Sequence, residues 1–238
     1  MTDTEIDRAK QAAREQVWAS LQREGATPPD VHGHIPDFVG AGLAAERLAG
    51  LAVWQAAHVI KSNPDRAQLP VRVNALSEGK LLYMAVPRLA TPEPFYVLDP
   101  TELQPPFGRI ATGEGAARAA LTIGVTEMRP VELVVCGSVA VNRRGVRVGK
   151  GAGYSDIEVA LLTEAGLIGP ETTIVTTVHT LQVVDDELPE TEHDFSVDLI
   201  VTPEDVIECR PPRRPIGIVL EHLTEEKRQA IPILRTAR

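Results

Sequence analysis

Basic side chains and glycines alternate between residues 143 and 156, where the sequence reads RRGVRVGKGAGYSD. The apolar run at 132–136 comes before them and predicts a buried strand, and the residues from Ser155 onward have helical periodicity. A strand, a basic glycine-rich loop and a helix N-terminus together favour phosphate binding, because backbone amides, the helix dipole and the cations all attract an anion. The alternative is a flexible surface turn that carries a solvated charge cluster.

Neither of the two common nucleotide-binding motifs fits this loop. The Walker A motif requires Ser or Thr directly after its Lys, and here Gly151 follows Lys150. The Rossmann fingerprint spaces its glycines as G-x-G-x-x-G after the first strand of the domain, whereas these glycines alternate strictly and lie past the middle of the chain.

The pattern R-x-G-x-G-x-G-Y-x-D, from Arg147 to Asp156, resembles the signature of the 5-formyltetrahydrofolate cyclo-ligases (methenyltetrahydrofolate synthetases). Further motifs of that family have counterparts in the same order along the chain: Lys10 and Arg14, Gly79-Lys80, Pro87-Arg88, Gln182, Leu188-Pro189 and His193-Asp194.

The chain also departs from the family pattern. Ser155 stands where the family usually has a second tyrosine, and Asn142 stands where an aspartate is usual. The segment 35–68 is longer than in the compact enzymes. We therefore expect a divergent, long-form branch of the family.

The resemblance implies an ATP- and Mg²⁺-dependent enzyme that converts 5-formyltetrahydrofolate to 5,10-methenyltetrahydrofolate through a phosphorylated formyl intermediate. It also implies the fold shared by sugar-phosphate isomerases and CoA transferases. Two alternatives stay open: the same ATP loop acting on another small molecule, for example in thiamine-related metabolism, or a nucleotide-responsive binding protein without turnover.

The resemblance assigns roles to particular residues. The cations neutralise phosphate, the glycines bring backbone amides close, Tyr154 stacks on a ring, and Asp156 and Asp194 bind Mg²⁺. Lys150, Arg147 and Tyr154 are the expected catalytic residues. The expected ATP-binding residues are Lys10, Arg14, Arg147, Gly149, Lys150, Gly151, Gly153, Tyr154 and Asp156.

Each role has a structural alternative. Lys10 and Arg14 lie four residues apart on a predicted helix, where exposure to solvent is usual. Asp156 can cap the helix that follows it or lie in its first turn, Asp194 can be a surface turn residue, and Tyr154 can simply pack.

Other candidate sites are weaker. Ser62-Asn-Pro-Asp65 follows a predicted strand and is a candidate for binding the second substrate, or an ordinary turn. A metal site at His32 and His34 lacks further ligands nearby, and His179 is expected to be structural. Cys136 is expected to be an inert core thiol.

Composition excludes some classes of protein. The 238 residues carry a net charge of −9, which argues against general nucleic-acid binding. The first residues are polar, and no apolar run approaches the ~20 residues that span a bilayer, so we expect a cytoplasmic protein that does not bind membranes. A small-molecule substrate, with a monomer or small homo-oligomer, is the expectation.

Alternating elements predict an α/β fold: three layers, with a largely parallel or mixed sheet covered by helices on both faces. We expect one domain over 1–238, with a helical part at 1–57, the sheet core at 58–209 and a strap and short helix at 210–238. The predicted strands are 58–61, 81–86, 95–98, 132–136, 172–178 and 197–201. The predicted helices are 2–24, 42–51, 54–57, 70–79, 114–122, 155 onward and 224–231.

Overall fold

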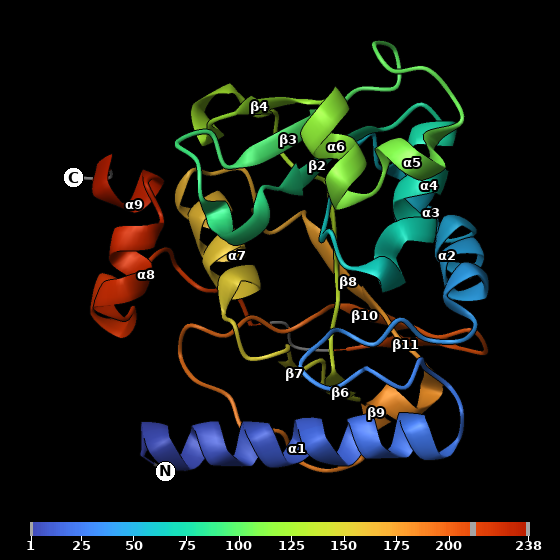
Figure 1. The fold of residues 1–238 in the computed structure, drawn as a ribbon, viewed down its shortest axis with the longest axis vertical. Coiled ribbons are helices and arrows are strands. Elements are labelled where there is room, and N and C mark those ends of the chain that lie inside the picture. The colour runs from blue at the N-terminus through green and yellow to red at the C-terminus, as the bar shows by residue number, and fades with distance from the viewer. Residues whose placement is uncertain (1, 210–212, 237–238) are drawn as a thin grey trace.

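The fold is built on an eight-stranded sheet, as the computed structural model shows for residues 2–209 and 213–236 (Figure 1). The strand order is β11-β10-β8-β5-β1-β2-β3-β4, and β10, β8, β5, β1 and β2 run parallel to their neighbours in that series. The remaining strands β3, β4 and β11 pair antiparallel at the edges. The strands are β1 (Val59–Ser62), β2 (Leu81–Ala85), β3 (Phe95–Leu98), β4 (Leu121–Ile123), β5 (Leu133–Cys136), β8 (Thr173–Thr177), β10 (Leu199–Val201) and β11 (Val206–Glu208).

Helices cover both faces of this sheet, which confirms the predicted α/β class (Figure 1). One apolar cluster joins Val134 of β5 to α7, and the other joins Val135 of the same strand to the helices on the opposite face. Successive strand residues point to opposite faces, so the central strands must be apolar throughout. The helices are α2 (Ala41–Ala49), α3 (Ala52–Ala56), α4 (Leu69–Ser77), α5 (Phe107–Ile110), α6 (Gly113–Ala119), α7 (Tyr154–Glu164), α8 (Glu225–Ala230) and α9 (Ile233–Thr236).

A second, three-stranded sheet joins α1 (Asp3–Arg23) to the main body (Figure 1). Its order is β7-β6-β9, with β6 (Ala140–Asn142), β7 (Arg147–Val148) and β9 (Val183–Val184). Val17 and Leu21 of α1 pack with Ala140 and Val148 in a third apolar cluster. The capping box of Thr2 and Glu5 begins α1, as predicted. The long helix is thereby fixed against the glycine-rich segment.

The structure corrects three local predictions. The helix predicted at 114–122 ends at Ala119, and the residues after it form the edge strand β4. The strand at 199–201 is not the last one, because β11 pairs with it beyond Pro203. The segment 142–153 is not all loop, since β7 forms a hairpin with β6. Of the predicted strap and short helix at 210–238, residues 210–212 and 237–238 lie outside the described residues.

Gly145 lies in the β6–β7 turn, where we expect substitution by any other residue to destabilise the protein. Its φ is +86°, and an added Cβ would lie 2.3 Å from the Val197 carbonyl oxygen. We expect Gly145→Ala to lower the free energy of unfolding by ~1–2 kcal/mol from the left-handed backbone and by a further ~1–3 kcal/mol from the clash.

Gly79→Ala is the matched control, measured alongside by urea denaturation. Gly79 has a φ of +78° but nothing within 4 Å of the added Cβ, so only the backbone cost applies. Equal losses in the two variants would contradict the assigned clash.

Candidate functional site

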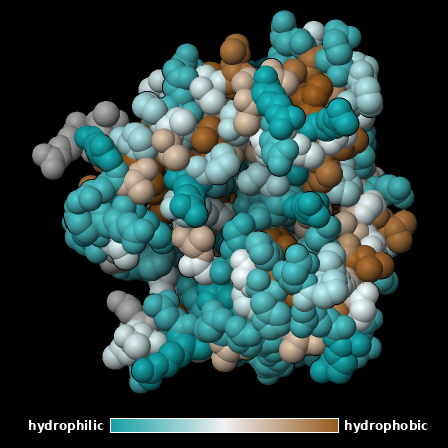
Figure 2. Space-filling model, viewed as in Figure 1, coloured by the Kyte–Doolittle hydropathy of each residue, from teal (hydrophilic) through white to brown (hydrophobic). Residues whose placement is uncertain are grey.

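A cavity of about 540 Å³ opens where the parallel strands β1, β2 and β5 end. Its walls include the loops that follow these strands, the glycine-rich segment, the first turns of α7, one side of α1, and residues 217–227 near the C-terminal helices. In Figure 2 the surface is notched between the C-terminal helices and the main body, and hydrophilic residues surround the notch. Parallel α/β sheets bind ligands at this edge, and the fold places the predicted loop there.

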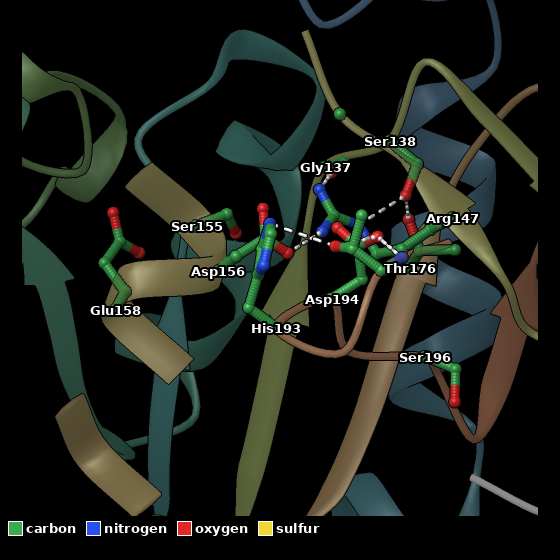
Figure 3. A network of polar contacts seen from close by, with 12 residues as sticks. Gly137, Ser138, Arg147, Ser155, Asp156, Glu158, Thr176, His193, Asp194 and Ser196 are labelled. Atoms are coloured by element: carbon green, nitrogen blue, oxygen red, sulfur yellow. Dashed lines mark hydrogen bonds and ion pairs between the residues drawn. The ribbon is translucent and has the colours of Figure 1, made fainter. Parts of the chain in front are cut away.

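Arg147 is the buried centre of the site (Figure 3). Its Nη1 donates to Oδ1 of Asp156 at 3.1 Å and its Nη2 donates to the carbonyl oxygen of Gly137 at 3.3 Å. The guanidinium carbon also lies 4.5 Å from the centre of the Phe195 ring. Burial opposes the charge, but the surrounding carboxylates, Asp156 above all, raise the pKa of Arg147. The pKa of Asp156 is raised by burial, which Arg147 offsets only in part.

Lys10 reaches the same site from α1. Its Nζ lies 2.5 Å from Oδ2 of Asp194, and Thr191 donates to the same carboxylate through its backbone N–H and its hydroxyl. Burial favours the neutral acid, but the hydrogen bonds and charge of Lys10, together with Thr191, lower the pKa of Asp194 below its ordinary value. Lys10 and Asp194 are therefore neither solvent-exposed nor surface turn residues, and both line the cavity.

The glycines let the cations come close to the loop backbone. Nε of Arg14 donates to the Gly149 carbonyl oxygen at 2.7 Å, and burial lowers the pKa of Arg14. A Cβ added at Gly149 would lie 2.8 Å from Nη2 of Arg147, and one added at Gly153 would lie 2.7 Å from Nζ of Lys227. A side chain at either position would displace a cation. Gly149 and Gly153 therefore stand at positions where the side chains of Arg147 and Lys227 lie against the loop backbone.

Two further predicted residues lie at the mouth of the cavity. Nζ of Lys150 lies 2.8 Å from Oδ1 of Asp65, so the loop after β1 and the glycine-rich segment face each other. Tyr154 begins α7, and its ring centre is 6.0 Å from Nζ of Lys227 in α8. The structure brings all the predicted site residues into one cavity, together with the candidate second-substrate loop at Asn63–Asp65.

The cavity residues suit a triphosphate with a divalent cation. Lys10 and Lys150 each face a carboxylate that can release them to phosphate oxygens, and Arg147 is a buried cation paired with Asp156. Within the described ranges, no three His, Cys, Asp or Glu side chains gather as a metal cluster. Mg²⁺ in nucleotide sites commonly takes one or two carboxylates plus phosphate oxygens, and Asp156 and Asp194 supply such a pair.

Comparisons with known proteins agree with this geometry. The sequence model of the 5-formyltetrahydrofolate cyclo-ligase family matches residues 6–203. The chain belongs to this family. It is 38% identical over 243 residues to the human methenyltetrahydrofolate synthase domain-containing protein and 38% identical over 244 residues to its bovine counterpart. These matches include 97% of this chain but 61% and 62% of the relatives, so the chain spans about three fifths of their length.

A solved structure shares the fold. The NMR structure of 5,10-methenyltetrahydrofolate synthetase from Aquifex aeolicus aligns with a TM-score of 0.54 and 20% sequence identity. The alignment covers 91% of this chain and 98% of that one. At this identity the likeness concerns the fold.

A buried network beside the cavity was missed by sequence reasoning. Lys61 of β1 is fully buried, pairs with Glu158 of α7, and donates to Oδ1 of Asn63 at 2.8 Å. Nδ2 of Asn63 donates to Oγ of Ser155 at 3.1 Å, so the serine that departs from the cyclo-ligase pattern is part of this network. One signal was present in the sequence: a lone lysine in an apolar strand requires a buried partner.

Most of the weaker candidates behave as structural residues, whereas His34 lines the cavity. Nδ1 of His179 accepts from the backbone of Leu181, as expected for a structural histidine. His32 pairs with Glu15 at 3.0 Å, at the surface. Cys136 is fully buried and its pKa is raised by that burial, which agrees with an inert thiol. Across the described part of the chain, no helix is both long and apolar enough to cross a membrane.

The Lys61–Glu158 pair predicts a non-additive pattern of stability. Glu158→Leu alone would leave a charged lysine buried without its partner and cost ~3–5 kcal/mol in the free energy of unfolding. Lys61→Met combined with Glu158→Leu removes both charges and should recover most of that loss. Chemical denaturation of Glu158→Leu, Lys61→Met and the double variant measures these losses. Additive losses would show that the two side chains do not depend on each other.

Proposed function

We propose that this chain catalyses the ATP- and Mg²⁺-dependent conversion of 5-formyltetrahydrofolate to 5,10-methenyltetrahydrofolate. The observation that carries the proposal is the convergence of separate elements on one cavity. Cations from α1 and β7, side-chain-free positions in the glycine-rich segment, and carboxylates from two other segments all line it. Membership of the cyclo-ligase family, across residues 6–203, supports the choice of reaction.

The cations would bind the triphosphate by exchanging their partners. In the structure Lys10 and Lys150 are held by Asp194 and Asp65. Phosphate oxygens carry more negative charge and accept charge-assisted hydrogen bonds, so they compete well for both ammonium groups. Asp194, once Lys10 releases it, becomes available for Mg²⁺ and would hold the ion together with Asp156, which also pairs with Arg147. When bound, the ion would neutralise charge on the phosphate oxygens.

The main contribution of the protein to the proposed reaction is the alignment of ATP with the folate. The formyl oxygen takes the γ-phosphoryl group, with ADP as the leaving group. The neighbouring folate nitrogen then attacks the formyl carbon, loses its proton to solvent and expels phosphate, which closes the ring. Arg147 and Lys150 would stabilise the charge on the transferred group, and Tyr154 would pack against a ring of one substrate. Fixed cations at the transfer point reduce the reorganisation needed during the reaction.

The direct test is an absorbance assay for methenyltetrahydrofolate with purified protein, Mg²⁺-ATP and 5-formyltetrahydrofolate. We expect product formation that requires ATP and falls when Mg²⁺ is removed with a chelator. ATP binding without turnover would refute this reaction. That result would favour another small-molecule substrate for this branch. The structural reason is that Ser155 stands at the usual tyrosine position and accepts a hydrogen bond from Asn63.

Lys150→Ala tests the contact between Lys150 and ATP without disturbing the fold. The Lys150 side chain is 40% exposed, so its removal should change stability little. We expect ATP affinity to fall by ~10-fold or more, as for loss of a charge-assisted contact to phosphate.

Calorimetric titration with a non-hydrolysable ATP analogue measures this affinity, with thermal melting as the check on folding. Arg144→Ala is the control, because Arg144 is an exposed cation of the same segment that pairs with Glu187 and does not line the cavity. Unchanged affinity in folded Lys150→Ala would remove this lysine from the nucleotide site.

A further inference from the structure

Arg88 stands at the cavity in a backbone conformation that its side chain does not favour. It follows β2 and has a φ of 59° and a ψ of 16°, and Leu89 after it has a φ of 51°. These are the two positive-φ residues other than glycine in the described parts of the chain. Strained backbone of this kind persists where the surrounding structure imposes it, and it is concentrated at functional sites.

Arg88 also differs from the other cations of the cavity in its contacts. Lys10, Arg147 and Lys150 each have a carboxylate partner, Arg14 donates to a backbone carbonyl, and Lys227 lies over the Tyr154 ring. Among the described residues, the exposed Arg88 side chain has no hydrogen bond or ion pair. It is therefore free to receive an anion without releasing a partner.

The position of Arg88 separates it from the triphosphate cluster. It follows β2, whereas Arg147 contacts the carbonyl that follows β5, and β1 lies between those two strands. Adjacent strands lie ~4.8 Å apart, so β2 and β5 end about 10 Å from each other. The cavity spans both ends, which gives it room for a second anionic group away from the triphosphate.

We propose that Arg88 binds a carboxylate of the second substrate and so sets its specificity for an anionic compound. The inference rests on the proposed function, since a reduced folate carries carboxylates on its glutamate, far from the formyl group. A guanidinium presents a planar fork that matches a carboxylate, which suits this role.

Arg88→Gly is the decisive variant, because glycine accepts the left-handed backbone while the guanidinium is lost. We expect a melting temperature equal to or above that of the wild type. We expect affinity for 5-formyltetrahydrofolate to fall by ~10-fold or more, with ATP affinity unchanged. Calorimetric titration with a non-hydrolysable ATP analogue present measures binding without turnover. The same compound without its glutamate should bind wild type and variant equally.

The control and the remaining outcomes separate this inference from the proposed function. Arg118→Ala removes an 81% exposed arginine of α6 that pairs with Glu114, and it should change nothing. Equal affinity of wild type and Arg88→Gly for the full compound overturns the inference. A matching loss for the trimmed compound or for ATP also overturns it. A wild-type protein that binds 5-formyltetrahydrofolate without turnover refutes the proposed reaction, and the affinities of wild type and Arg88→Gly still decide the inference. A wild-type protein that binds no folate overturns both.

Discussion

The site depends on one buried cation, the guanidinium of Arg147. A charge removed from water is tolerated only where polar groups or an aromatic ring face surround it, and here these come from several elements. Asp156 lies in the first turn of α7, the Gly137 carbonyl follows β5, and Phe195 lies in the segment before β10. Because all of them must meet the same guanidinium, the small sheet, the main sheet and the helix are fixed relative to one another (Figure 3).

The cavity therefore holds its cations in place before any anion arrives. Lys10 and Lys150 come from elements far apart in the sequence, and each is held by an acid from another segment of the chain. This arrangement limits the repulsion among the cations and keeps their side chains near the positions where phosphate would need them. Preorganised charges of this kind stabilise a transition state with little further movement. The glycines contribute by leaving the space that the guanidinium and ammonium groups occupy.

Local signals predicted the larger elements well. The capping box at Thr2 and Glu5 and the apolar runs of the central strands act within a few residues, so α1 and the parallel core followed from the sequence. The edge strands β4 and β11 and the strands of the small sheet did not. Each is two or three residues long and is defined by the strand beside it. The sequence carries no short-range signal for such a partner.

For the site, the sequence alone determined the residue types, the spacing of Arg147 to Asp156 and the resemblance to the cyclo-ligase family. The tertiary structure decided which charges meet. Lys10 and Asp194 are 184 positions apart, and Lys61 and Glu158 are 97 apart. Coulomb attraction and hydrogen bonding depend on distance in space and on burial, and neither quantity exists until the sheet has brought its strand ends together.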